Sequence, residues 1–156
     1  MQNYIKSQTR LAFVQYIFQN EFLGTDSSES IEDFKKHFYN TNIALIDDKK
    51  EFKLKFNKNF LNRLFRSLEN NIDKKNIIND LNGLIDINRK FEKWDNILKS
   101  IIFAIIAELL ITEKNKFKIV FNDYLNISKS LVSQKGTKLI NAIIQKYLNK
   151  NEIYKK

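Results

Sequence analysis

The sequence has no cysteine and no proline, and its 156 residues include only three glycines and one histidine. Without cysteine, neither a disulfide nor a thiolate metal site can form. A metal site usually needs three or four protein ligands, and the chain has a single histidine, His37. We therefore expect no metal ion and no cofactor. The glycines are isolated, which excludes a phosphate-binding glycine loop. No serine or cysteine nucleophile has supporting context, so we expect no enzyme.

The scarcity of helix-breaking residues predicts the fold class. Apolar residues recur at helical spacing with few glycines and no proline to interrupt them. A chain of this length suits one domain and buries roughly 70% of its unfolded surface without disulfides. We therefore predict an all-α, single-domain helical bundle of about seven helices over residues 1–156. We expect its basic tail, residues 150–156, to fray.

The charge balance is strongly basic, with a formal net charge of +9. Such a surface favours a polyanionic partner, because lysine and arginine neutralise phosphates and release counterions. The same lysine excess, with abundant asparagine, isoleucine and phenylalanine, is equally typical of an AT-rich genome. Residues 1–24 have no continuous apolar core and no small-residue cleavage site. We therefore expect no signal peptide, no membrane contact and a cytoplasmic protein.

Residues 97–111, ILKSIIFAIIAELLI, form a strongly apolar stretch. A helix that is apolar on every face is surrounded by other elements or by lipid. This stretch is shorter than the roughly 20 residues of a membrane span and contains Glu108, so we predict a central helix wrapped by protein. Asp95 stands at the expected N-cap. We interpret Glu108 as structural, satisfied by a lysine or by N–H groups at a helix start.

Further helices are predicted around this central one. Residues 3–23 form a helix whose apolar stripe runs through Leu11, Val14, Phe18 and Phe22, with Lys6 and Arg10 on the opposite face. It ends at Gly24, and Ser30 caps a short helix over residues 31–40. Residues 133–137 are expected to form a turn, with Thr137 as the N-cap of the last helix. The remaining stripes are Leu61, Leu64, Phe65, Leu68 and Ile72; Ile77, Ile78, Leu81 and Leu84; Val120, Tyr124, Ile127 and Leu131; and Leu139, Ile140, Ile143, Ile144, Tyr147 and Leu148.

Four pieces of sequence, in chain order, carry a resemblance to a known family. They are RLAFVQYIF from Arg10, WDNIL with a following AEL from Trp94, KIVFNDYL from Lys118 and KLINAII from Lys138. Together they resemble the NusB family of bacterial transcription antitermination factors. The resemblance covers roughly the first 20 and the last 65 residues, and its last three pieces are spaced without a gap.

The resemblance implies a binding function without chemistry. The chain would bind boxA-like single-stranded RNA of nascent ribosomal RNA transcripts together with NusE, a small-subunit ribosomal protein. It would help RNA polymerase, within the antitermination complex, to pass terminators. Two alternatives stay open: a basic all-α protein-interaction scaffold, and a stand-alone relative of the NusB-like domain of ribosomal RNA cytosine methyltransferases. Chain length argues against the second.

Two basic regions are expected to bind the RNA. The first is the start of the first helix, with Lys6 and Arg10. The second is the start of the last helix, where the N-terminus of the helix adds N–H groups for phosphate; its residues are Lys135, Thr137, Lys138 and Asn141. For the protein partner we expect Phe18, which stands where the family has tyrosine, and Leu98 on the central helix. Taken singly, each of these two residues is better explained as part of the hydrophobic core.

Residues 51–60 fit two patterns. Phe52, Leu54 and Phe56 alternate with lysines as in a strand, whereas Phe52, Phe56 and Phe60 fit a helix. Periodicity alone does not decide between them. The helical surroundings and the family resemblance favour a helix, with a short extended lead-in left open.

Overall fold

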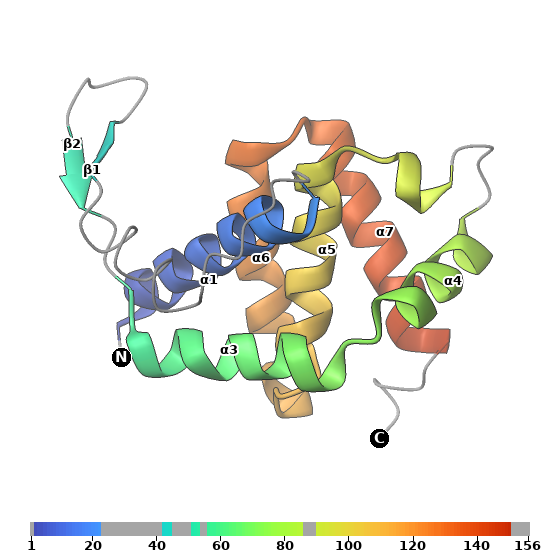
Figure 1. Ribbon diagram of the computed structural model, residues 1–156, viewed down its shortest axis with the longest axis horizontal. Helices are drawn as coiled ribbons and strands as arrows, with labels where there is room; N and C mark the ends of the chain where they lie inside the picture. The colour runs from blue at the N-terminus through green and yellow to red at the C-terminus, as the bar shows by residue number, and fades with distance from the viewer. Residues whose placement is uncertain (1, 23–41, 45–50, 54–55, 86–89, 151–156) are drawn as a thin grey trace.

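The computed structural model describes residues 2–22, 42–44, 51–53, 56–85 and 90–150, and this part contains six α-helices (Figure 1). The helices are α1 (Asn3–Ile17), α3 (Lys58–Asn71), α4 (Lys74–Leu84), α5 (Asn96–Leu109), α6 (Phe117–Leu131) and α7 (Gln134–Lys150). The shorter elements are the π-helix η1 (Phe18–Phe22), the strands β1 (Asn42–Ala44) and β2 (Glu51–Lys53), and the 3-10 helices η2 (Phe91–Lys93) and η3 (Lys114–Lys116). The predicted all-α fold is confirmed. None of the described helices is long and apolar enough to cross a membrane.

Helix α5 forms the centre of the bundle. It stands upright in the middle of Figure 1 and packs against α1, α3, α6 and α7. Every residue from Leu98 to Leu109 is buried, as the apolar stretch predicted. Asp95 occupies the N-cap position, and its backbone carbonyl accepts from the Lys99 N–H at 3.0 Å. Its side chain makes no capping hydrogen bond.

Helices α3 and α4 begin at side-chain caps. The Asn57 side chain accepts a hydrogen bond from the Phe60 N–H, and Asp73 accepts one from the Asn76 N–H. Each cap satisfies a backbone donor that the first helical turn leaves free. The predicted stripe of α3 is buried as a whole, from Leu61 to Ile72.

The buried face of α1 differs from the predicted stripe. The core residues of this helix include Phe13, Val14 and Ile17, whereas Leu11 and Phe18 are only half-buried. The buried face therefore includes position 10, and Arg10 is 6% exposed. The prediction that Arg10 lies on the solvent face is wrong. Burying a guanidinium is costly unless it is paired, and its partners lie on distant helices that α1 alone does not reveal.

The structure corrects the helix favoured for residues 51–60. Glu51–Lys53 forms strand β2, which pairs antiparallel with β1 so that Ile43 opposes Phe52. Helix α3 begins only at Lys58. The strand-like alternation was therefore the correct signal for the extended lead-in, and the cap at Asn57 separates it from the helix. The predictions for Gly24, Ser30, the helix over 31–40 with His37, and the tail after residue 150 fall outside the described residues.

Helix α7 begins one turn earlier than predicted. The Ser133 hydroxyl oxygen accepts from the Gly136 N–H at 3.1 Å, so Ser133 caps the helix. Thr137 therefore lies within the first turn, and its N–H donates to the Ser133 carbonyl at 2.9 Å. A Cβ on Gly136 would lie 3.1 Å from Val132, so the glycine permits a close approach between the end of α6 and the start of α7.

Candidate nucleic-acid interface

Arg10 connects α1 to both α5 and α6. Its Nε donates to the two carboxylate oxygens of Glu108 at 2.9 and 3.0 Å, and its Nη2 donates to Glu108 Oε2 at 2.7 Å. Its Nη1 donates to Asp123 Oδ2 at 2.6 Å. The guanidinium also lies over the rings of Phe60 and Tyr124. All three of its nitrogens thus donate to carboxylates within the fold, which makes Arg10 a structural residue.

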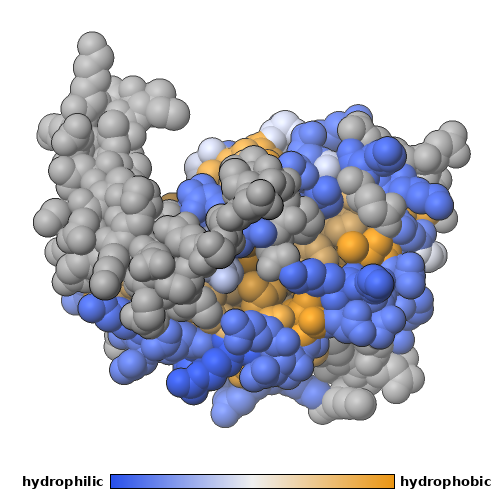
Figure 2. Space-filling view, in the orientation of Figure 1, coloured by the Kyte–Doolittle hydropathy of each residue, from blue (hydrophilic) through white to orange (hydrophobic). Residues whose placement is uncertain are grey.

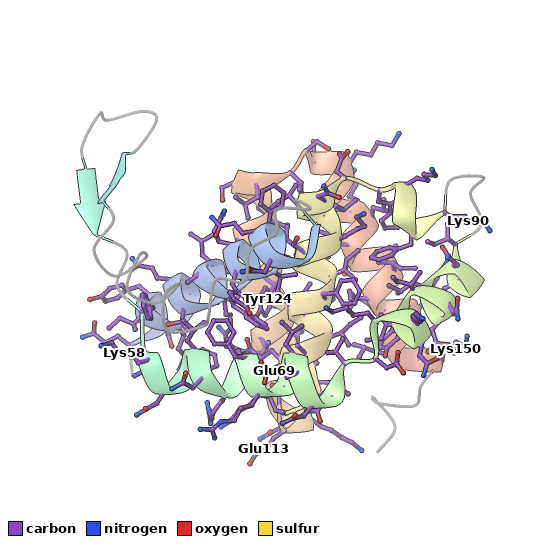
Figure 3. All side chains as sticks on the ribbon, in the orientation of Figure 1. Lys58, Glu69, Lys90, Glu113, Tyr124 and Lys150 are labelled. Atoms are coloured by element: carbon purple, nitrogen blue, oxygen red, sulfur yellow. The ribbon has the colours of Figure 1, made fainter. Side chains whose placement is uncertain are left out.

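Two hydroxyl groups complete this network. The Tyr124 hydroxyl donates to Glu108 Oε1 at 2.8 Å, and the Ser7 hydroxyl donates to Asp123 Oδ1 at 2.7 Å. Glu108 is structural as predicted, but its partners are an arginine and a tyrosine rather than a lysine or a helix start. Figure 3 shows Tyr124 deep in the bundle.

The electrostatics of the network keep Arg10 charged. Burial lowers the pKa of Arg10, but hydrogen bonds and charge from Glu108, with a further bond from Asp123, outweigh it and raise that pKa above its usual value. Burial raises the pKa of Tyr124 well above its ordinary range, and the Glu108 charge adds to the effect. Tyr124 therefore stays a neutral donor at physiological pH.

Lys6 lies at the edge of a groove between α1 and α6. The groove has a volume of about 560 Å³, and its polar lining residues include Asn3, Lys6, Lys116, Asn122 and Asn126. A second hollow of about 250 Å³ shares Lys6 and Lys116 and adds Arg63 from α3. Cationic side chains from three elements of the bundle therefore surround one end of α1.

Sequence reasoning did not select Arg63 or Lys116 for this surface. Arg63 is exposed, and its guanidinium lies 5.4 Å from the centre of the Phe60 ring. Lys116 lies 4.0 Å from Glu113, with both side chains largely exposed, and such a pair is weak. Figure 3 shows Glu113 at the lower edge of the view, away from the body of the bundle. Only the fold brings these cations next to Lys6.

The second predicted region lies on the first turns of α7. Lys135, Lys138 and Asn141 are exposed, and the two lysines are three positions apart, which makes them neighbours on a helix. Thr137 instead faces α6, where its hydroxyl lies 3.0 Å from that of Ser128. Asn141 accepts a bond from Gln145 at 3.3 Å.

Helix α6 lies between the two regions. It contacts α1 through Asp123 and α7 through Ser128, and these residues are about 7.5 Å apart along the helix axis. Its exposed side carries Asn122, Asn126 and Lys129. Over residues 117–150 the sequence has six lysines and a single acid, Asp123, which is already paired with Arg10. Helices α6 and α7 therefore present a basic outer surface without an unpaired carboxylate.

The two residues expected to bind a protein partner have different environments. Phe18 is half-buried where α1 passes into η1. Leu98 is 7% exposed and belongs to the hydrophobic core. The partner role for Leu98 requires an accessible side chain, so that placement is wrong and the core alternative holds.

One face of the bundle combines an apolar hollow with a hydrophilic edge. Figure 2 shows hydrophilic residues along α3 and hydrophobic residues above them. The apolar residues lining a hollow of about 590 Å³ on α1 and α3 are Tyr16, Phe65, Leu68 and Ile72. The charged residues on its rim include acids as well as lysines, so this hollow lacks the uniform charge of α6 and α7.

Comparison with known proteins decides the family. The sequence profile of the NusB family matches residues 7–149. The chain belongs to the NusB family. Among its relatives in that family are three named transcription antitermination protein NusB. The protein of Rickettsia conorii is 27% identical over 145 residues, which cover 90% of this chain and 89% of the relative. Those of Rickettsia felis and Rickettsia typhi are 26% and 27% identical over 150 residues, covering 94% of this chain and 92% of each relative.

The family match begins within α1, at residue 7, and continues through the other described helices to residue 149 in α7. It includes the Arg10, Glu108 and Asp123 network and the basic surface of α6 and α7. No solved structure matches this NusB family chain significantly.

Proposed function

We propose that this NusB family member is a transcription antitermination factor that works by binding RNA and protein rather than by catalysis. The observation that supports RNA binding is the outer surface of α6 and α7. Its six lysines, of which only Lys150 pairs with an acid on another described helix, accompany one neutralised acid. Such a surface attracts phosphates and is weakened by salt. Support for antitermination comes from the family and from the names of the Rickettsia relatives.

The RNA-binding residues divide into two roles. Lys6, Lys135 and Lys138 neutralise phosphates, and Asn141 hydrogen-bonds the strand. Arg10 and Thr137 support RNA binding indirectly, because their side chains hold helices together. Arg10 fixes α1 against α6, and Thr137 fixes α7 against α6. The proposed RNA is a boxA-like single strand of nascent ribosomal RNA transcripts.

The proposed protein partner is NusE, within the antitermination complex of RNA polymerase in the cytoplasm. Phe18 is the residue we retain for this contact, since it is half-buried at the end of α1 and is not part of the core cluster. An aromatic side chain of this kind supplies apolar area at low entropic cost.

RNA binding is tested by gel shift with boxA-like and scrambled RNAs, each with and without NusE. The variant Lys135→Glu/Lys138→Glu is compared with Lys74→Glu/Lys75→Glu, a matched reversal on exposed residues of α4. We expect the α7 variant to lose affinity and to show a shallower salt dependence, while the α4 variant binds as the parent does. Equal binding by both variants would refute the proposed surface.

A protein-interaction scaffold is the second candidate function. It is favoured by Leu110 and Ile111 at the end of α5, which are 39% and 43% exposed. Salt separates the two functions, because RNA affinity falls steeply with ionic strength and an apolar protein interface depends on it little.

A further inference from the structure

The groove between α1 and α6 offers three kinds of contact to a nucleotide: an exposed apolar side chain, amide groups and lysine ammonium groups. We propose that it holds one nucleotide of single-stranded RNA, with the base against Ile119, Asn122 and Asn126 and the flanking phosphates on Lys6 and Lys116. This inference rests on the proposed function and locates a base-reading site within it. The groove includes Lys6 of the first region that the sequence predicts and lies outside the second region, on α7.

One wall of the groove is a single face of α6. Ile119, Asn122 and Asn126 follow at intervals of three and four residues, so they lie in line along one side of the helix. The opposite wall comes from α1, where Asn3 and Lys6 are also three residues apart. The volume of about 560 Å³ lies within the range of small-ligand sites.

The amide groups of this wall are available to a ligand. Asn122 is exposed and makes no hydrogen bond to any residue that the structure describes. Asn126 is exposed, and its oxygen accepts a 3.3 Å bond from the Lys129 ammonium, which water or a ligand can replace. An amide both donates and accepts, which suits the edge of a splayed-out base.

The apolar part of the wall suits the face of a base. Ile119 is 69% exposed, the most exposed of the large hydrophobic residues described. An isolated apolar side chain at the surface is ordinary. Here it lies in one groove with two exposed amides, one turn before Asn122 on the same helix face. Together they provide contact for both the face and the edge of one base.

The ends of the groove provide the phosphate contacts. Lys6 forms no ion pair with any described residue, and Lys116 forms only the long, exposed pair with Glu113. The acid on the floor, Asp123, is bound by Arg10 at 2.6 Å and by Ser7 at 2.7 Å. Its charge is therefore compensated, and the same two bonds fix α1 against α6. The groove is formed before any ligand arrives, which lowers the entropic cost of binding.

The test uses the full chain with the boxA-like RNA and with a set of RNAs that each change one base of it. Three variants are compared: Asn122→Ala/Asn126→Ala, Lys6→Gln/Lys116→Gln, and Asn79→Ala as a control on the exposed face of α4. RNAs carrying 4-thiouridine at successive positions are crosslinked in parallel, and the crosslinked peptides are identified by mass spectrometry.

We expect the asparagine variant to lose about fivefold or more in affinity for the parent RNA and to lose discrimination at one base position. The lysine variant should weaken binding to every RNA and reduce the salt dependence. One position of 4-thiouridine should crosslink to the peptide containing Ile119. Asn79→Ala should behave as the parent protein.

The outcomes separate the inference from the proposed function. If the parent protein binds RNA but the asparagine variant keeps its affinity and discrimination, and crosslinks fall elsewhere, the groove does not hold a base. If the asparagine variant binds all RNAs more weakly by the same factor, the two asparagines do not distinguish one base from another. The inference is then also overturned. If the parent protein binds no RNA, the proposed function fails and the inference fails with it.

Discussion

The guanidinium of Arg10 and the carboxylate of Glu108 lie 98 residues apart in the sequence and form hydrogen bonds of 2.7 to 3.0 Å in the core of the bundle. Both side chains are less than 10% exposed. The pair joins the first helix to the central one, and Asp123 extends the connection to α6. A charged group that the sequence pattern places on the solvent face of α1 thus lies in the core.

The first prediction concerns the loss of this buried pair. Arg10→Met keeps an unbranched side chain about as far as the Nε position but leaves the Glu108 carboxylate buried without its cation. We expect the free energy of unfolding to fall by about 3–5 kcal/mol, as measured by urea denaturation. Adding Glu108→Leu should recover part of the loss, because the unpaired charge is then removed as well.

The exposed Arg66 of α3 provides the control for this prediction. Arg66→Met should change stability by about 0.5 kcal/mol or less, as is usual for a surface residue. A loss in Arg10→Met no larger than the loss in Arg66→Met would contradict the role assigned to the pair.

The spacing of apolar residues predicts the buried face of a helix when that face depends only on the helix's own sequence. Residues 101–107 are apolar on every face, and their burial in α5 needs no information from elsewhere. The stripe from Leu61 to Ile72 has the same property. The cap of α3 at Asn57 was not recognised, because residues 51–60 offered both a strand and a helical spacing.

The site was harder to predict, because its geometry depends on distant residues. The sequence places Arg10 in solvent because nothing near it along the chain can neutralise it, whereas its partners come from two other helices. Arg63 and Lys116 lie on separate elements, and only the packing of α1 against α3 and α6 brings them close to Lys6. By contrast, Lys135 and Lys138 are exposed neighbours because one helix carries both.

The second prediction is a pH dependence from Tyr124. The folded state raises the pKa of its hydroxyl by burial and by the Glu108 charge, above the unfolded value of about 10. The folded protein therefore keeps a proton that the unfolded chain loses. The stabilising contribution is complete below pH 10 and is lost as the pH rises above 10 toward the folded pKa.

Tyr124→Phe removes this titration and the 2.8 Å bond to Glu108. We expect a loss of about 1–3 kcal/mol at neutral pH. The decline in stability above pH 10 should also be shallower than in the parent protein. Tyr4→Phe, at a residue that is 50% exposed, serves as the control and should match the parent at every pH. An equally steep alkaline decline in both variants would show that Tyr124 does not titrate as described.

The third prediction contrasts two helical glycines. A Cβ on Gly83 would meet only the Lys150 ammonium at 3.8 Å, whereas a Cβ on Gly136 would meet Val132 at 3.1 Å. Gly83→Ala should therefore raise the free energy of unfolding by about 0.5–1 kcal/mol, because alanine has the higher helix propensity. Gly136→Ala should gain less or destabilise, because the crowding opposes the same propensity. A larger gain at Gly136 than at Gly83 would contradict the close approach of α6 and α7.

The last prediction separates the two kinds of residue on α7. Thr137 bonds Ser128 on α6, whereas Lys138 is exposed. Thr137→Val keeps the shape and should cost about 1 kcal/mol of stability through the lost hydrogen bond, with RNA affinity unchanged in conditions where the protein is folded. Lys138→Gln should show the reverse, with full stability and weaker RNA binding. Denaturation measures the stability of both variants, and RNA titration measures their affinity. The prediction is contradicted if Thr137→Val weakens RNA binding as much as Lys138→Gln does. Such a result would mean that the threonine hydroxyl contacts the strand directly, and the start of α7 would then bind RNA with both sides of its first turn.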